Sequence, residues 1–207
     1  MKPTATLLML LMTAPAGHAA LAAADTPLRH CTQLISNVER LACFDAATGT
    51  PPSARASDVI RQNESTRPEG DSTFLLTDST EPPAGQQRVV ISAPALNTQP
   101  PIYLAITCLS NISRLQLLAD RPFDRHQMTV QLYMDDRPLS AARPWRVLAE
   151  GNVADAGRGL VAIDQLRPFV AGQRLRVESD YALFNGLTFN ATGLQALLSR
   201  QREACHW

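Results

Sequence analysis

The segment QMTVQLYM, at residues 127–134, alternates apolar and polar side chains along its whole length. Alternate side chains of an extended strand point to opposite faces, so this segment would have one wholly apolar face: Met128, Val130, Leu132 and Met134. The segment IYLAITCL, at residues 102–109, also places its apolar side chains on one face: Ile102, Leu104, Ile106 and Cys108. This period of two predicts antiparallel strands packed on a core.

Short segments of the same kind recur through the second half of the chain. They are Arg88–Ala93, Ile102–Leu109, Arg114–Ala119, Gln127–Met134, Arg146–Glu150, Arg174–Ser179 and Leu187–Ala191. Turn-forming residues separate several of them, and only Asp164–Val170 is compatible with an intervening helical turn. Many short strands with few helices between them favour a mostly β (α+β) fold, an antiparallel β-sandwich over residues 73–207.

The sandwich is predicted to end in a C-terminal helix. A capping box, Thr192-Gly193-Leu194-Gln195, would begin this helix. Cys205 lies almost three full turns after Leu194, so both side chains point the same way. Cys108 is also on the apolar side of its strand. Four cysteines allow three pairings, and this geometry favours Cys108 with Cys205, which would attach the helix to the sheet.

A second pair of cysteines, Cys31 and Cys43, flanks a predicted helix start at Ser36. Ser36-Asn37-Val38-Glu39 is a capping-box pattern, and Gly49 would stop the helix near residue 47. On one straight helix the two cysteines would stand about 18 Å apart, whereas bridged Cα atoms lie within about 7 Å. The break at Ser36 permits a disulfide-linked helical hairpin over residues 25–48. A zinc site is disfavoured, because no Cys-x-x-Cys occurs.

Residues 1–24 have the features of a secretory signal peptide: Lys2, then a short apolar run, then small residues. Cleavage is predicted after Ala19 or after Ala24. The apolar run is too short to cross a bilayer, so no stable membrane insertion is expected after cleavage. An even number of cysteines suits the oxidising compartment that such a signal implies. Residues 49–72 are rich in proline and small polar residues and predict a flexible linker. A short helix over residues 57–62 is an alternative for part of this stretch.

Composition excludes some classes of partner. The chain has 207 residues, of which 45% are hydrophobic and 18% charged, and its 19 basic residues balance 19 acidic ones. The only lysine is Lys2. The sequence therefore lacks the basic excess that a nucleic-acid-binding surface requires, and it predicts a globular domain with appendages.

One set of side chains is a candidate metal or catalytic site: Asp120, Asp124 and His126, followed by Asp135 and Asp136. These oxygen and imidazole groups suit either a metal or a hydrolase. Arginines interleave with them, however, as in solvated turns with weak surface ion pairs. The chain has no Gly-x-Ser-x-Gly nucleophile elbow, and its cysteines are predicted to be bridged. We therefore expect no catalytic, metal or cofactor residues and a protein that is not an enzyme.

Several blocks, taken in order, resemble one protein family. They are Cys31, RLACFD at residues 40–45, ITC at 106–108, FNATGL at 189–194 and REACHW at 202–207. This ordered set is similar to the VasI/TagO family of proteins associated with type VI secretion. The resemblance runs from about Cys31 to the last residue and excludes the linker. It departs from the family pattern at Thr107 and Met134, where an arginine is expected.

The resemblance implies a periplasmic accessory protein of a type VI secretion system with a non-enzymatic binding or scaffold role. Its partner would be another cell-envelope or secretion-apparatus protein, or peptidoglycan. The alternative is a periplasmic hydrolase that acts on the cell wall through Asp120, Asp124 and His126. Arg40 and Asp45, which belong to the RLACFD block, are candidate structural residues, because such pairs more often hold a helix to its neighbour.

Overall fold

A computed structural model describes residues 28–49, 55–81 and 86–207. The predicted signal peptide and its two cleavage sites lie outside these ranges. The chain divides into two units, residues 1–53 and residues 54–207. Within the described ranges, no helix combines the length and the apolar character that a membrane crossing requires.

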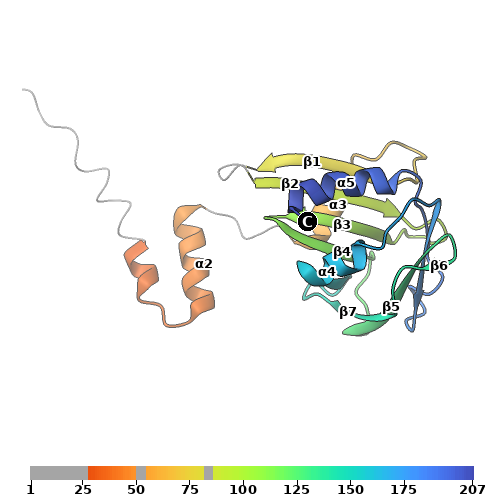
Figure 1. The fold of residues 1–207 in the computed structure, drawn as a ribbon. Helices are drawn as coiled ribbons and strands as arrows, with labels where there is room; N and C mark the ends of the chain where they lie inside the picture. The colour runs from red at the N-terminus through yellow and green to blue at the C-terminus, as the bar shows by residue number, and fades with distance from the viewer. Residues whose placement is uncertain (1–27, 50–54, 82–85) are drawn as a thin grey trace, which may run out of the picture. The chain divides into compact units, whose positions relative to one another are not determined.

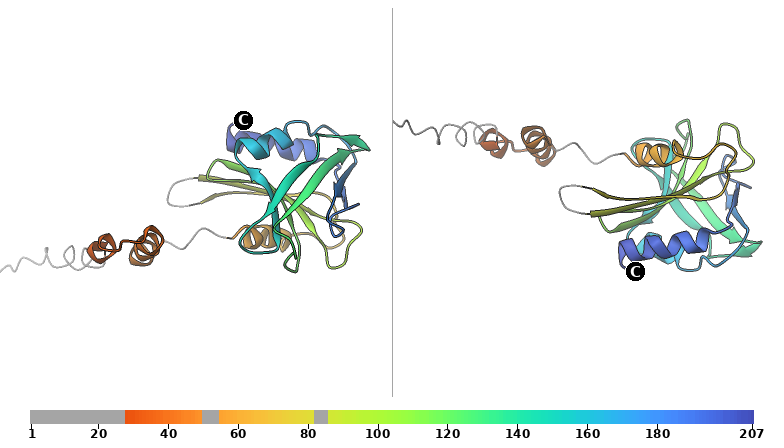
Figure 2. Two further views of the ribbon diagram at one scale, coloured as in Figure 1. Left: turned by 90° about the horizontal axis from the view of Figure 1, so that it is seen from below. Right: turned by 90° about the horizontal axis from the view of Figure 1, so that it is seen from above.

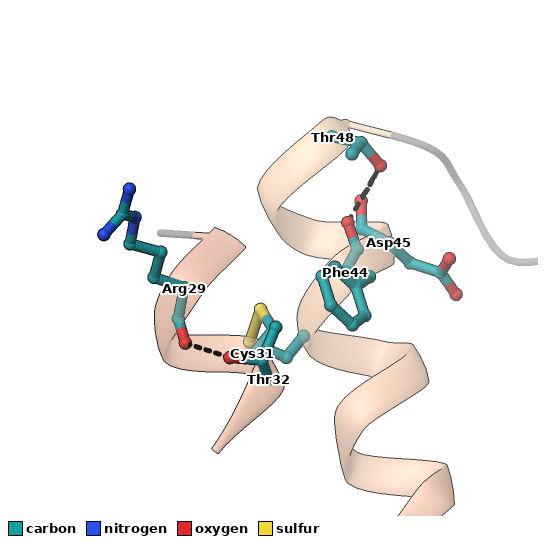
Figure 3. The surroundings of a disulfide bond; sticks show 7 residues. Arg29, Cys31, Thr32, Phe44, Asp45 and Thr48 are labelled. Atoms are coloured by element: carbon teal, nitrogen blue, oxygen red, sulfur yellow. Dashed lines mark hydrogen bonds between the residues drawn. A yellow bond between two sulfur atoms is a disulfide. The ribbon is translucent and has the colours of Figure 1, made fainter. Parts of the chain in front are cut away.

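The first unit is the predicted helical hairpin, formed by a helical turn at residues 28–32 and helix α2 (Asn37–Thr48). The Ser36 side chain caps α2 by accepting a hydrogen bond from the Glu39 N–H, and Gly49 ends it in the left-handed conformation. The Cys31–Cys43 disulfide joins the two parts, with its Cα atoms 5.4 Å apart. Figure 3 shows Cys31 facing α2 across this hairpin. Since α2 buries none of its residues, the bridge is the main constraint on the unit.

The second unit is built on one antiparallel sheet. Its strands are β1 (Leu75–Glu81), β2 (Gln86–Pro94), β3 (Tyr103–Leu109), β4 (Ile112–Leu118), β5 (Gln127–Met134), β6 (Arg137–Pro138), β7 (Arg143–Val147), β8 (Val153–Arg158), β9 (Arg174–Ser179) and β10 (Thr188–Asn190). Their spatial order is β1-β2-β3-β4-β8-β7-β5-β9-β10, and β6 pairs with β5. The predicted mostly β, antiparallel fold is confirmed.

The sheet curls strongly, so the layers of the predicted sandwich belong to one continuous sheet, which closes within the described residues at a single bridge, just before β1 (Figures 1 and 2). Thr73, just before β1, bridges to Asn190 in β10. The Leu96 N–H also donates to the Thr188 carbonyl at 2.8 Å. The main core fills the inside of the curl and includes the alternating side chains predicted from β3 and β5. We call this side of the sheet the inner face.

Helices α4 (Leu160–Leu166) and α5 (Leu194–Cys205) help to close the main core. Leu194, Leu198 and Cys205 are buried on one side of α5, as the sequence predicted. The Cys108–Cys205 disulfide attaches α5 to β3, with Cα atoms 5.8 Å apart. The predicted capping box is wrong, because Gly193 in the left-handed conformation precedes the helix and no side chain caps it.

Helix α3 (Ala56–Glu64) covers the opposite, outer face of the sheet (Figure 2). Ile60 is fully buried there against three residues of the sheet: Ala105, Leu118 and Val153. Glu150 holds the start of the helix by accepting hydrogen bonds from the N–H groups of Ala56 and Ser57, at 2.9 and 3.0 Å. The flexible linker predicted over residues 49–72 is therefore wrong for residues 55–72, which belong to the β unit.

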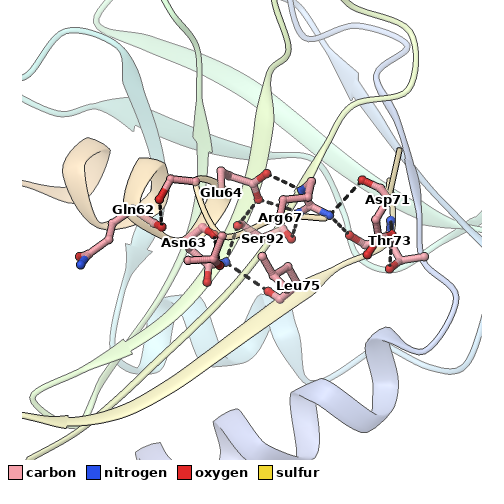
Figure 4. A network of polar contacts seen from close by, with 10 residues as sticks. Gln62, Asn63, Glu64, Arg67, Asp71, Thr73, Leu75 and Ser92 are labelled. Atoms are coloured by element: carbon pink, nitrogen blue, oxygen red, sulfur yellow. Dashed lines mark hydrogen bonds and ion pairs between the residues drawn. The ribbon is translucent and has the colours of Figure 1, made fainter. Parts of the chain in front are cut away.

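A buried polar network, the α3 network, fixes the other end of α3 (Figure 4). It consists of Asn63, Glu64, Arg67 and Ser92. Arg67 forms a two-point ion pair with Glu64, at 2.7 and 2.8 Å, and donates to the carbonyls of Thr73 and Ser92. The Ser92 hydroxyl donates to Glu64 and accepts a hydrogen bond from Asn63. These contacts join α3 to β2 and to the segment before β1.

Candidate binding site

The structure does not bring the predicted Asp120, Asp124 and His126 together. Asp120 forms an ion pair with Arg61 at 3.6 Å. Asp124 instead interacts with Tyr181: burial raises the pKa of that phenol, and a hydrogen bond to Asp124 and the negative charge of its carboxylate raise it further. His126 uses its backbone carbonyl to accept the Val147 N–H. Within the described ranges, no group of three or more histidine, cysteine, aspartate or glutamate side chains is placed to hold a metal ion.

The side chains of Arg40 and Asp45 do not contact each other in the hairpin unit that the structure describes. The Arg40 guanidinium donates to the Asn37 side chain at 2.6 Å, one turn earlier on α2. The Asp45 carboxylate points away from the disulfide (Figure 3). No ion pair joins Arg40 to Asp45 in the part of the chain that the structure describes, so their predicted structural role stays a prediction.

The two positions that depart from the family pattern are both buried. Met134 points into the main core and is 2% exposed. Thr107 is 2% exposed on the opposite face of β3, and its hydroxyl has no hydrogen-bond partner among the residues that the structure describes. An arginine at either position would have to be buried, and in this chain neither position contributes charge to the surface.

A polar cluster, the Arg176 cluster, occupies the outer face of β5 and β9. Its members are Tyr133, Asp136, Arg174, Arg176 and Glu178. Tyr133 and Arg176 are cross-strand partners, and the guanidinium lies 4.3 Å from the centre of the phenol ring. Arg176 also pairs with Glu178, two residues along the same strand, at 2.5 Å. The alternation that sends Leu132 and Met134 inward therefore places these polar groups together outside.

A tight turn extends the Arg176 cluster to the end of the sheet. Asp135 and Asp136 form the turn between β5 and β6, and both have positive φ, as a two-residue hairpin turn requires. The Asp135 carboxylate accepts the N–H groups of Gln173 and Arg174. Asp136 accepts a hydrogen bond from Arg174 at 2.6 Å. The turn is thus fixed to the start of β9 from both of its residues.

An open hollow of about 420 Å³ lies beside this turn. We call it the β9 hollow; its lining residues are Leu96, Asp135, Asp136, Gln173, Arg174, Phe189 and Asn190. Phe189 is fully buried, whereas Leu96 is exposed. The hollow thus combines the exposed apolar side chain of Leu96 with carboxylates, amides and one guanidinium. Such a mixture is typical of a recognition site.

Charge in the Arg176 cluster is balanced within the cluster itself. Hydrogen bonds from Arg176 and from the Tyr133 hydroxyl lower the pKa of Glu178. The pairing therefore stabilises the fold at neutral pH, and this contribution is lost as the pH falls through the lowered pKa. The same hydrogen bonds raise the pKa of Tyr133 and of Arg176. The cluster can orient a polar partner, but its arginines are already paired with carboxylates.

Sequence reasoning singled out Asp136, which lies in a turn, but missed the other members of the Arg176 cluster because each occupies an ordinary outward position on a strand. Only the pattern Arg174-Leu175-Arg176-Val177-Glu178, with three charges on one face, distinguishes it from a generic solvent-facing strand. Tyr133 comes from a different strand, so its place above Arg176 depends on the β5–β9 register.

We expect the substitution Glu178→Gln to lower the phenol pKa of Tyr133, because it removes the negative charge that the phenol faces. An alkaline absorbance titration would measure this in a Tyr103→Phe, Tyr181→Phe background, where Tyr133 is the only tyrosine. Glu203→Gln is the control, since Glu203 pairs with Arg200 on α5. An unchanged titration in Glu178→Gln would contradict the hydrogen bond to Tyr133.

Comparison with known proteins identifies a family. The family described as "Type VI secretion system VasI, EvfG, VC_A0118" matches residues 30–207, which include both disulfides, the sheet and all the described helices from α2 to α5. No curated protein matches the chain in these comparisons. No solved structure matches it either. The match covers most of the chain, and this protein therefore belongs to the VasI family of type VI secretion system proteins.

Proposed function

We propose that this protein is a periplasmic accessory component of a type VI secretion system, which binds another envelope component and catalyses no reaction. Membership of the VasI family supports the link to type VI secretion. Two disulfides suit an oxidising compartment, and the predicted signal peptide would deliver the chain there. The partner is another protein of the envelope or the apparatus, or peptidoglycan.

The observation that carries a binding role is the β9 hollow beside the Arg176 cluster. Its walls are held by backbone hydrogen bonds to Asp135 and by the Asp136–Arg174 ion pair, so the surface is formed before any partner arrives. A preformed surface loses little conformational entropy on binding. Its polar groups satisfy one another, and they do not form the nucleophile and base arrangement that catalysis needs.

A test in cells compares variants in a bacterium that uses this system. Deleting the gene is expected to reduce effector delivery and sheath assembly, and the wild-type chain should restore both. Replacing Gln173 and Arg174 by alanine should fail to restore them fully, because both side chains line the β9 hollow. Arg167→Ala is the matched control, since Arg167 is an exposed arginine on another part of the surface. Undiminished delivery after deletion would refute the proposed function.

The alternative, cell-wall hydrolysis, has its own discriminating measurement. Purified protein incubated with cell-wall sacculi should release no soluble fragments. Release that disappears in His126→Ala would contradict the proposal and restore the hydrolase hypothesis, although His126 and Asp120 make separate contacts in the structure.

A further inference from the structure

Strand β1 forms one end of the sheet order and pairs only with β2 among the described strands. The pairing is regular over the whole strand, from Leu75 opposite Ser92 to Glu81 opposite Gln86. Figure 1 shows β1 along the edge of the sheet, and Figure 2 shows it with α3 on one side and α5 on the other. An edge of this kind presents backbone groups to which another strand can add.

The register identifies which backbone groups face outward. The Ala95 N–H donates to the Ile102 carbonyl, so the odd-numbered residues of β2 exchange hydrogen bonds with β3 and the even-numbered ones with β1. Val90 lies opposite Thr77, so the odd-numbered residues of β1 point their backbone groups toward β2. The N–H and C=O groups of Leu76, Asp78 and Thr80 therefore point away from the sheet.

A hollow runs beside this edge, between α3 and the outer face of β1. Its volume is about 190 Å³, and we call it the α3 hollow. It combines apolar and polar side chains with one arginine; its lining residues are Val59, Gln62, Asn63, Thr66, Thr77, Ser79, Arg88 and Val90. Because α3 is fixed by the α3 network and by Glu150, the wall of the hollow is rigid. A strand added to β1 would place alternate side chains over it.

The charge at the centre of β1 argues against a second copy of this chain as the occupant. In a symmetric antiparallel pairing of two β1 strands in full register, Asp78 would lie opposite Asp78. Like charges directly opposite each other are destabilising. Asp78 already pairs with Arg200 of α5 at 2.8 Å, and that contact fixes it at the edge.

We infer that an extended segment of another protein adds to β1 as a new edge strand. It exchanges backbone hydrogen bonds with Leu76, Asp78 and Thr80, and its alternate side chains, small aliphatic or hydroxyl-bearing, enter the α3 hollow. This inference rests on the proposed binding function and gives it a site and a class of partner. The β9 hollow then serves as a separate contact.

A backbone test uses two substitutions at one position, Asp78→Pro and Asp78→Ala. Both remove the carboxylate, but only proline removes the outward N–H, and proline is tolerated on edge strands where the N–H faces solvent. A displayed library of random heptapeptides is selected on the full-length oxidised protein. Peptides so obtained should bind Asp78→Ala nearly as well as the wild type and Asp78→Pro about tenfold more weakly, because one backbone hydrogen bond is lost. Equal binding to both variants would overturn the inference.

A second test leaves the backbone unchanged, in case proline disturbs the strand. Thr77→Trp should block the α3 hollow and weaken the same peptides, whereas Gln127→Trp, at an exposed outer-face position on β5, should not. Hydrogen exchange in the complex should show new protection at the amides of Leu76, Asp78 and Thr80. Protection confined to other strands, or failure to select any peptide, would count against strand addition.

Two further results separate the alternatives. A wild-type dimer in light scattering that Asp78→Pro dissociates would show that a second copy occupies the edge, and would refute a foreign segment. In cells, loss of effector delivery on deletion with full restoration by Asp78→Pro would refute the inference while leaving the proposed function intact. Undiminished delivery on deletion would refute the proposed function itself, whatever the peptides do.

Discussion

Replacing Cys108 and Cys205 by alanine is expected to lower the free energy of unfolding of the β unit by about 4–5 kcal/mol, by the chain-entropy estimate for a closed loop of this length. The two cysteines are 97 residues apart, so the bridge restricts most of the unfolded β unit. It also anchors α5, whose Leu194 and Leu198 complete the main core. Urea denaturation followed by tryptophan fluorescence measures the effect, because both tryptophans, Trp145 and Trp207, lie in the β unit.

The other disulfide supplies a matched control. Replacing Cys31 and Cys43 by alanine removes the same number of sulfur atoms, but from the hairpin unit. The urea concentration at the midpoint of the tryptophan-detected unfolding of the β unit should therefore not change. Equal shifts in the two double variants, or no shift in Cys108→Ala, Cys205→Ala, would show that the long bridge does not stabilise the sheet in the way described.

Glu64→Ala is expected to destabilise the β unit by about 3–5 kcal/mol, the usual cost of removing one partner of a buried ion pair. The side chains of Glu64 and Arg67 are only 6% and 11% exposed. Without Glu64, the Arg67 guanidinium would remain buried with only backbone carbonyls as partners. Urea denaturation gives the total effect, and hydrogen exchange should show that the amides of α3 open most readily.

An exposed pair of the same spacing provides the comparison. Asp164 and Arg167 are also three residues apart, but their side chains are 54% and 62% exposed. Asp164→Ala should therefore change stability by less than about 1 kcal/mol. A double variant, Glu64→Leu with Arg67→Met, should recover part of the loss, because it leaves no uncompensated charge. Equal effects of Glu64→Ala and Asp164→Ala would contradict the buried network.

The elements that the sequence predicted best are those with strong local patterns. The alternation in Gln127–Met134 is confirmed by β5, where one buried face leaves little freedom of register. The segment Ile102–Leu109 also forms the predicted strand, β3, but both of its faces are buried, the outer one beneath α3. The structure also contains both disulfides, Cys31–Cys43 and Cys108–Cys205. Helical period and strand alternation indicated the Cys108–Cys205 pair, and the helix break at Ser36 indicated the Cys31–Cys43 pair.

Three strands were not predicted: β6 is only two residues long, and β1 and β8 have residues that resemble those of loops. Strand β8, VADAGR, contains alanine, aspartate and glycine, which have low β propensity, yet Ala154 and Ala156 are buried in the main core. Strand β1, LLTDSTE, is an edge strand with an exposed polar half. In both cases tertiary packing, rather than local preference, selects the strand. The predicted strand at Arg146–Glu150 was also displaced, since β7 begins at Arg143 and ends at Val147.

Composition averaged over residues 49–72 predicts a linker, with a short helix over residues 57–62 as the alternative, whereas α3 spans Ala56–Glu64. The few large aliphatic residues of that stretch, Val59 and Ile60, are the ones that it buries. The α3 network joins Ser92 to residues at least 25 positions earlier in the chain, such as Arg67. A local sequence pattern therefore cannot predict it. The Arg176 cluster depends in the same way on pairing between β5 and β9.

The bridges link the cysteines in consecutive pairs along the chain: the first to the second, and the third to the fourth. A polypeptide that is threaded into an oxidising compartment with its N-terminus leading would present its thiols in that order. Each native partner would then be the next thiol to arrive, and correct oxidation would follow from the order of translocation, without any need to reshuffle mismatched pairs.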